Sequence, residues 1–165
     1  MAWGDLQGVL CPWLIFAAAL VRVTWGLMPF EPKLFVYGTL LPDDRGAFGA
    51  AERTRLAAEA DLIGAATTRG LLADLGDYPG LIGGNGLVHG AVYRLRDPAR
   101  TLAWLDDYEG VTGAAGDTYA RETRSITLST GAIVMCWSYC LVQPIVDCTL
   151  IVSGRWCLRS SGPAA

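Results

Sequence analysis

Apolar residues gather into short runs along the chain, and turn-forming residues separate these runs. Residues 34–37 form one such run, which ends at Gly38 and predicts a short buried strand that leads directly into a turn. Residues 62–75 and 87–95 have extended patterns, the first of them bent at its two glycines. A buried strand that ends in a glycine turn leaves the next backbone amides without ladder partners, so these amides are available to a ligand.

Two other segments carry the composition or the end signals of helices. Residues 50–60 are rich in Ala, Glu, Arg and Leu, which favour a helix. Asp97 and Pro98 form a helix start, with Asp as the N-cap and Pro at the first helical position. Gly110 is expected to end this second helix, and its leucines are spaced to pack inward.

The carboxyl-terminal half predicts a pair of strands. Residues 119–129 have an arginine-rich polar face, Gly131 is placed for a hairpin turn, and residues 132–142 return as an apolar strand. Residues 77–80 read Asp-Tyr-Pro-Gly, which is a turn signal. Several strands with two short helices predict an α+β domain.

The composition is that of one globular domain. The 165 residues are enough for one core and too few for two ordinary domains, and 52% hydrophobic with 18% charged residues argues against disorder. The net charge is −3 and the arginines are scattered, so we expect no nucleic-acid partner, which would require a basic face. Lys33 is the only lysine among 13 basic residues, which with the abundant Ala and Gly suggests a GC-rich bacterial gene.

The cysteines and the histidine do not have the spacing of a metal site. The five cysteines stand at positions 11, 136, 140, 148 and 157. Cys136 and Cys140 are separated by about 13 Å if they lie in one strand, so they cannot bridge each other. His89 is the only histidine, and the thiol spacing is not that of a zinc site. We expect no metal, and free thiols in a reducing cytoplasm.

The amino-terminal residues form an apolar segment of their own. Residues 9–21 are apolar but are broken by Pro12 and followed by Arg22, and this run is shorter than the about twenty residues that a membrane-spanning helix needs. No positive side chain precedes the run, as a signal peptide would require. Two interpretations stay open, namely a weak membrane-associated segment through residues 9–30 and a mis-assigned start upstream of Met28.

Six short motifs give more specific evidence. In chain order they are Leu34–Pro42 (LFVYGTLLP), Asp77–Leu81 (DYPGL), Val88–Tyr93 (VHGAVY), Leu105–Val111 (LDDYEGV), Tyr119–Arg121 (YAR) and Ser153–Trp156 (SGRW). Each is too short to be specific alone, and their common order makes coincidence a poor explanation. Together they resemble the gamma-glutamylcyclotransferase-like family, in the branch of the plant avirulence-induced proteins and the gamma-glutamylamine cyclotransferases.

This resemblance covers residues 33–157 and implies both a fold and a reaction. The implied fold is a small mixed β-barrel with flanking short helices and a cavity at one end. Residues 1–32 are then an amino-terminal extension and residues 158–165 a flexible tail. The implied reaction is attack of the α-amine of a γ-glutamyl compound on its own γ-carbonyl, which releases 5-oxoproline and an amine. Such a reaction needs no metal or cofactor, because holding the amine against the carbonyl already lowers the barrier.

The resemblance also assigns candidate site residues. Glu109 matches the glutamate of the family's Glu-Gly motif and would serve as a proton shuttle. Its place at the carboxyl end of a helix, where the macrodipole disfavours negative charge, predicts a raised pKa. Asp106 and Asp107 are expected to face elsewhere. The substrate would be bound by the segment Tyr37, Gly38, Thr39 and Leu40 through backbone amides, and by Tyr78 and Tyr119 at the cavity.

Two positions depart from the family pattern. Ala91 stands where the family commonly has glutamate, and Arg155 stands where it usually has aspartate. These departures leave open an alternative, a non-catalytic or acyltransfer relative that binds a small amine or carboxylate ligand in the same cavity. We expect a small-molecule γ-glutamyl substrate and a cytoplasmic protein. The motifs identify neither the leaving amine nor an oligomeric state.

Overall fold

The first strand, β1 (Lys33–Val36), is buried on both faces, which explains its unbroken apolar sequence. The computed structural model describes residues 32–144 and 148–157. The other strands are β2 (Ala60–Asp74), β3 (Pro79–Leu95), β4 (Tyr119–Leu128), β5 (Ile133–Leu141) and β6 (Thr149–Leu150), and the helices are α1 (Ala50–Glu59) and α2 (Pro98–Glu109).

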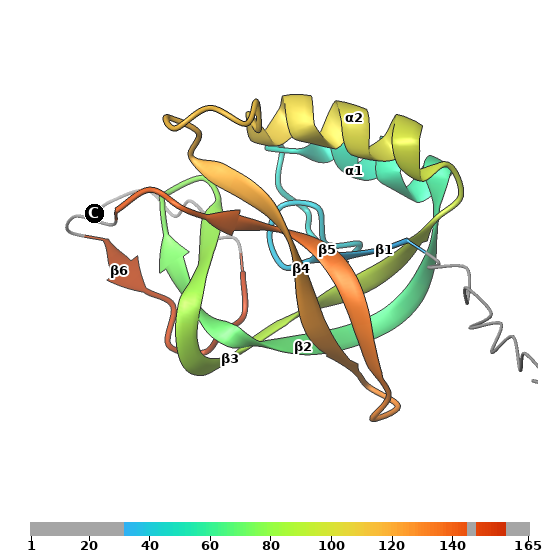
Figure 1. Ribbon diagram of the computed structural model, residues 1–165. Helices are drawn as coiled ribbons and strands as arrows, with labels where there is room; N and C mark the ends of the chain where they lie inside the picture. Colours follow the sequence, from blue (N-terminus) through green and yellow to red (C-terminus); the bar gives the residue numbers. More distant parts are fainter. Residues whose placement is uncertain (1–31, 145–147, 158–165) are drawn as a thin grey trace, which may run out of the picture. The chain divides into compact units, whose positions relative to one another are not determined.

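The strands close into a small mixed barrel with both helices on one side (Figure 1). The sheet order is β3-β1-β5-β4-β2-β6, and an additional pairing of β2 with β3 closes a ring of five strands. β1 runs parallel to β5, whereas the other pairs are antiparallel. The predicted α+β fold, a mixed β-barrel with flanking short helices, is confirmed.

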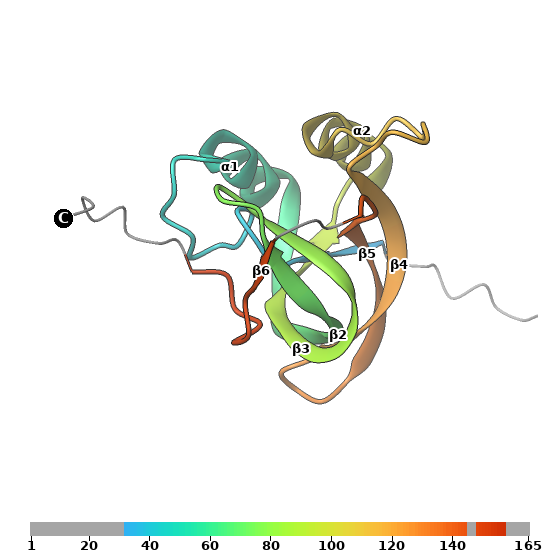
Figure 2. The same ribbon diagram turned by 90° about the vertical axis from the view of Figure 1, so that its left-hand side faces the viewer.

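β3 begins earlier than the sequence pattern predicts, whereas β2 is close to the predicted segment. They pair from Ala60 with Leu95 to Asp74 with Pro79, so the extended segments expected at 62–75 and 87–95 belong to one long antiparallel ribbon. Register shifts near Gly64 and Gly70 bend this ribbon, at the two glycines where bends were expected. Figure 2 shows how the ribbon curls around the lower part of the barrel.

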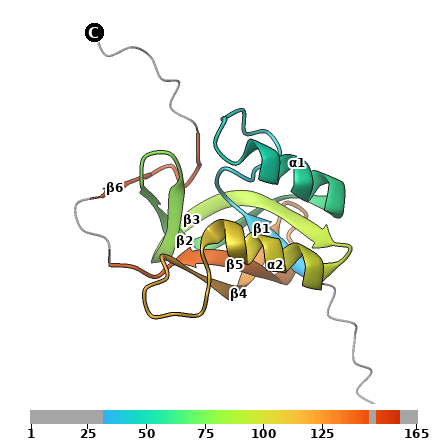
Figure 3. The same cartoon turned by 90° about the horizontal axis from the view of Figure 1, so that it is seen from above.

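The core consists of two clusters that share β1. Phe35 and Tyr37 point into the cluster formed with Leu72, Val92 and other barrel residues. Leu34 and Val36 point to the opposite side and pack with residues of both helices, among them Leu56 of α1 and Leu105 of α2. Seen from the helix side in Figure 3, β1 runs below the two helices. Because successive strand residues face opposite ways, one strand fixes the barrel to its helices.

The second helix begins and ends as its sequence predicts. Asp97 is the N-cap, and its Oδ1 accepts a hydrogen bond of 3.2 Å from the backbone N–H of Arg100. Gly110 ends the helix in the left-handed conformation, with φ 66° and ψ 34°. Leu105 is fully buried and Leu102 is partly buried against the same cluster.

Several expectations lie outside the described residues. They are those for residues 1–31, including the run at 9–30, Met28 and Cys11, and for the tail at 158–165. The four cysteines within the described residues, at positions 136, 140, 148 and 157, are free thiols. Among the described residues, no helix has both the length and the apolar character needed to span a membrane.

Candidate active site

A cavity of about 290 Å³ lies where β1 ends and β3 and β4 begin. It is lined by all seven residues that the sequence assigns to the site, namely Tyr37, Gly38, Thr39, Leu40, Tyr78, Glu109 and Tyr119. Its volume is close to the lower end of the range for small-molecule sites, about 300 Å³. Four segments that are distant in sequence therefore meet around a space of the size of a small metabolite.

Gly38 allows the loop after β1 to approach the start of β3. A Cβ atom at this position would lie 2.8 Å from Cγ and 2.9 Å from Cδ of Pro79. The φ angle of Gly38 is not positive, so its backbone conformation does not require glycine. The close approach of Pro79 explains why a residue without a side chain stands here. The carbonyl of Gly38 accepts a hydrogen bond from the N–H of Leu41 at 2.9 Å, which closes the turn.

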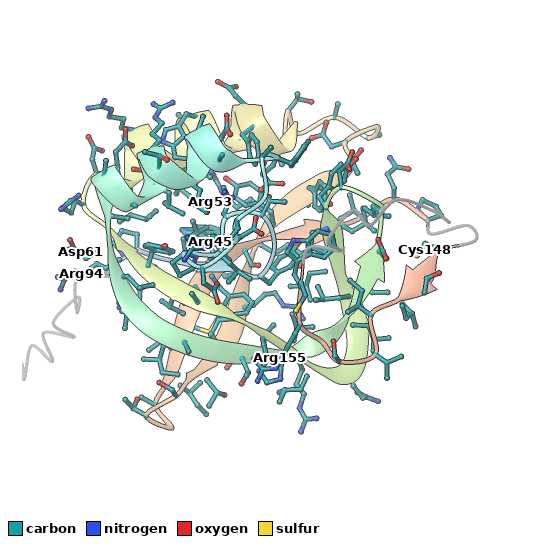
Figure 4. All side chains as sticks on the ribbon, turned by 180° about the vertical axis from the view of Figure 1, so that it is seen from behind. Arg45, Arg53, Asp61, Arg94, Cys148 and Arg155 are labelled. Carbon is teal, nitrogen blue, oxygen red and sulfur yellow. The ribbon has the colours of Figure 1, made fainter. Side chains whose placement is uncertain are left out.

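The turn leaves donors free at the cavity. Among the described residues, none accepts a hydrogen bond from the backbone N–H of Gly38, Thr39 or Leu40. Arg53 of α1 holds this loop from behind (Figure 4), because its guanidinium donates to the carbonyls of Thr39 and Gly46 and to Asp44. The loop is thus fixed through its carbonyls while its amides remain available to an anionic ligand.

Glu109 is the last residue of α2 and lies partly buried in the cavity. Within the part of the chain that the structure describes, its carboxylate has no ion pair and no hydrogen bond. Burial raises its pKa from 4.5 to about 7. The expected direction of the shift holds, and loss of solvation on burial is its cause.

Two buried tyrosines connect the cavity to the strands. The hydroxyl of Tyr37 donates to the carbonyl of Tyr139 at 2.7 Å and accepts from the N–H of Leu81 at 3.2 Å. The hydroxyl of Tyr119 donates to the carbonyl of Pro79 at 3.1 Å. Burial first, and the nearby Glu109 among the further causes, raise the pKa of both tyrosines. Both phenols are therefore neutral and act as hydrogen-bonding groups.

Aromatic rings from four segments form one wall. Phe48 stacks on Tyr78 with ring centroids 5.5 Å apart, and it tilts against Tyr108 at 6.4 Å. Tyr78 in turn lies 6.5 Å from Tyr119. The hydroxyls of Tyr108 and Thr39 are 3.4 Å apart, which links the end of α2 to the loop after β1. The described lining contains no lysine, arginine or histidine, so its charged side chains are carboxylates.

The loop between α2 and β4 is ordered by Asp117. Its carboxylate accepts hydrogen bonds of 2.7 Å from the backbone N–H and the hydroxyl of Thr112, and from the N–H of Gly113. Hydrogen bonds from Thr112 lower the pKa of Asp117. This arrangement fixes the glycine-rich segment, and so it sets where Tyr119 begins β4 relative to Glu109.

The expectation that Asp106 and Asp107 face away from the site is wrong for Asp107, whereas Asp106 is not among the residues that line the cavity. Asp107 lines the cavity. Asp106 accepts a hydrogen bond of 2.8 Å from the hydroxyl of Tyr139, which also lines the cavity, and pairs with Arg121 at 2.6 Å. Helical spacing does not exclude these side chains, because the last turn of α2 sits over the mouth of the barrel, where more than one face of the helix finds partners.

Sequence reasoning also missed Tyr139, Phe48 and Tyr108 as lining residues. Tyr108 stands inside the LDDYEGV motif and could have been found from its position next to Glu109. Tyr139 lies in an apolar strand, where its pattern is that of a core residue. Phe48 belongs to an irregular loop, where no periodicity indicates a direction.

Comparison with known proteins identifies the family of the chain. The model of the family described as gamma-glutamyl cyclotransferase, AIG2-like, matches residues 34–158. The chain belongs to this family. A gamma-glutamylcyclotransferase family protein, ytfP of Citrobacter rodentium, is 39% identical over 85 residues, which are 52% of this chain and 65% of that protein. A relative from Vibrio cholerae is 36% identical over 128 residues, 76% of this chain and 96% of the relative.

A solved structure shows the same fold. The solution NMR structure of ytfP from Escherichia coli has a TM-score of 0.53 and 36% sequence identity, and it matches 75% of this chain and 95% of its own. The family match includes both departures, Ala91 and Arg155. Neither residue lines the Glu109 cavity; both line a second cavity on the barrel.

Proposed function

We propose that the chain is a cyclotransferase that releases 5-oxoproline from a γ-glutamyl amine or peptide, with Glu109 as the proton shuttle. One observation carries this proposal. A carboxylate with a pKa of about 7 stands without a partner among the described residues, in the same cavity as three free backbone amides. Unpaired, partly buried carboxylates are costly, and they are found where chemistry requires them.

Two groups of a γ-glutamyl substrate, the α-ammonium and the γ-carbonyl, would find complementary groups in this cavity. Its ammonium group would be attracted by the carboxylates of Glu109 and Asp107, and no cationic side chain of the described lining would oppose it. The amides of the Gly38 loop would face the oxygen of the γ-carbonyl, where negative charge develops in the reaction. Tyr119 and Tyr78 would border the substrate as aromatic walls.

In the first step, the carboxylate of Glu109 takes a proton from the α-ammonium. The freed amine attacks the γ-carbonyl carbon, a new C–N bond closes the five-membered ring, and the oxyanion forms at the loop amides. In the second step, the oxyanion collapses, the bond to the leaving nitrogen breaks, and protonated Glu109 gives its proton to that nitrogen. The regenerated carboxylate then takes the excess proton from the ring nitrogen, which the attack left positively charged, and passes it to the released amine. A group with a pKa near 7 can both accept and donate the proton at neutral pH. The products are 5-oxoproline and a free amine, and no water is consumed.

The alternative of a relative that only binds a ligand or transfers an acyl group is supported in the sequence by Ala91 and Arg155. Because both residues lie outside the Glu109 cavity, they give no reason to expect its chemistry to be lost.

The direct test is to incubate the protein with a panel of γ-glutamyl amines and γ-glutamyl dipeptides and to quantify 5-oxoproline by mass spectrometry. We expect release of 5-oxoproline together with an equal amount of the free amine from at least one compound. Binding without any release, measured by calorimetry on the same panel, would favour the alternative. Transfer of the glutamyl group to an added amine, with no 5-oxoproline, would identify an acyltransferase.

A further inference from the structure

A second cavity of about 450 Å³ lies on the side of the barrel and is larger than the Glu109 cavity. Five segments line it, namely residues 41–43 of the loop after β1, 62–67 of β2 except 63, 89–91 of β3, 127–129 around the end of β4, and 155–157. Four of the residues that line it are Gly64, Ala65, Gly90 and Ala91. Their small size leaves room that larger side chains would fill.

The carboxyl-terminal side of this cavity is anchored by the SGRW motif. The backbone N–H of His89 donates to the carbonyl of Gly154 at 2.8 Å. Gly154 has φ +61°, and a Cβ atom there would lie 1.8 Å from the carbonyl oxygen of Leu87. Only glycine allows this approach, so the motif holds the next two residues, Arg155 and Trp156, beside β3. The proposed cyclotransferase chemistry uses none of these residues.

The described lining of this cavity has one cationic side chain, Arg155, and one anionic side chain, Asp43. Arg155 is exposed, and among the described residues it forms no ion pair. Figure 4 shows it at the lower part of the barrel, away from the helices. It lies close enough to His89 to contribute, after burial, to lowering the pKa of that imidazole. Asp43, on the opposite loop, is the single carboxylate of the described lining.

Trp156 adds an unmet hydrogen-bond donor. Its Nε1 is buried and has no hydrogen-bond partner among the described residues. Buried donors without partners are rare in proteins, so this one requires an explanation. The indole N–H is covered in this structure, so a ligand would reach it after a small rotation of the ring, and would first meet the guanidinium of Arg155.

The two departures from the family pattern meet at this cavity. Ala91 and Arg155 both line it. A guanidinium that pairs with none of the described residues favours an anionic group at this cavity.

We propose that this cavity binds a small organic monocarboxylate with an apolar body. The guanidinium of Arg155 pairs with the carboxylate, and the body lies on the small apolar residues of β2 and β3 beside the Trp156 ring. A single unpaired guanidinium and the carboxylate of Asp43 disfavour ligands with several negative charges. The proposal does not depend on the cyclotransferase activity, because it uses a different cavity and different residues.

The test is an NMR titration of the ¹⁵N-labelled full chain with hexanoate. The indole N–H resonance of Trp156, assigned by its loss in Trp156→Phe, reports directly on the cavity. We expect saturable shifts of this resonance and of the amides of His89 and Gly90, with a Kd on the order of 1 mM for so small a ligand. Hexan-1-ol and hexylamine, which keep the apolar chain without the carboxylate, should bind at least about tenfold more weakly.

Two variants test whether the charge of Arg155 is responsible for binding. Arg155→Gln should weaken hexanoate binding by about tenfold and should leave 5-oxoproline release, if present, unchanged. Arg100→Gln removes the same charge from an exposed arginine of α2 and should leave binding unchanged. The proposal is overturned if hexanoate causes no saturable shift, if hexan-1-ol binds as well as hexanoate, or if Arg155→Gln binds hexanoate as tightly as the original protein.

Discussion

At Glu109 the protein keeps an ionisable side chain where a neutral one would be more stable. The carboxylate is partly buried, and none of the described residues pairs with it. Burial raises its pKa to about 7, so the folded protein holds the proton more tightly than the unfolded chain does. Such a residue weakens the fold at neutral and alkaline pH, which is a cost typical of a functional site.

This cost can be measured as a dependence of stability on pH. The folded-state pKa of Glu109, about 7, lies above the unfolded value of 4.5, so its favourable contribution is complete below pH 4.5 and is lost as pH rises through 7. We expect Glu109→Gln to be more stable than the original protein at pH 8 by roughly 1 to 3 kcal/mol, and to lose most of this advantage at pH 4.5.

Urea unfolding at the two pH values gives this comparison. Glu122→Gln is the matched control, because Glu122 lies on β4 with a side chain that is 49% exposed. It should show no such gain. Equal stability of Glu109→Gln and the original protein at pH 8 would mean that Glu109 is not desolvated in solution.

At the level of single elements, local signals were enough for some predictions and not for others. α2 was predicted at both ends because Asp97, Pro98 and Gly110 act through neighbouring backbone. The first part of β3, residues 79–86, was not predicted as strand, because Pro79 and several glycines interrupt the local pattern and its pairing with β2 cannot be read from that pattern. The direction of Asp107 was missed because the cavity that it lines is built by other segments. The partners of Asp106, Tyr139 and Arg121, are likewise supplied by other strands and were not predicted.

The loop that would bind the substrate depends on α1 through one side chain. Arg53 donates to the carbonyls of Thr39 and Gly46 and pairs with Asp44 at 3.0 Å. We expect Arg53→Gln to reduce stability by about 1 to 3 kcal/mol, because these carbonyls and Asp44 lose a charged donor. The backbone amides of the loop after β1 would then be held less rigidly, and substrate binding would weaken. We expect KM to rise by about tenfold, with a smaller effect on kcat.

Thermal unfolding and steady-state kinetics on the same preparations test this expectation. Arg55→Gln, on the same helix but with a side chain that is 46% exposed, is the control and should be close to neutral in both measurements. If Arg53→Gln lowers kcat and leaves KM unchanged, the loop does not bind the substrate in its ground state.

At the scale of the whole molecule, closure of the barrel brings six sequence motifs to two places. The YGTL, DYPG, YEG and YAR segments supply the Glu109 cavity, whereas VHGA and SGRW supply the cavity beside Arg155. The motifs predicted which residues matter through a family resemblance. The motifs could not predict which of them line the Glu109 cavity and which line the cavity beside Arg155. That assignment depends on how β1, β2 and β3 wrap around the core.

The amino-terminal residues give a prediction at the same scale. The family match begins at residue 34, and the described elements begin with β1 at Lys33. We expect a protein that starts at Met28 to remain soluble and to melt within a few degrees of the full chain, because it keeps every described element and the whole stretch that the family model matches. Calorimetry of the two proteins checks this. Aggregation or a large drop in Tm would show that the apolar run stabilises the domain.

The central claim is that Glu109 moves the proton, and turnover of Glu109→Gln tests it most directly. The amide keeps the size of the carboxylate but cannot exchange the proton, so the rate of 5-oxoproline release should fall by about a hundredfold or more. KM should change much less, since the loop amides are intact. In the original protein, kcat should fall as pH decreases below about 7, where Glu109 becomes protonated.

The assay uses the γ-glutamyl compound with the fastest turnover, with Glu122→Gln as the matched control. We expect Glu122→Gln to release 5-oxoproline at the original rate. Glu109→Gln should remain folded but lose this activity. A Glu109→Gln protein that releases 5-oxoproline at more than about a tenth of the original rate would contradict the assignment of Glu109 and the mechanism built on it.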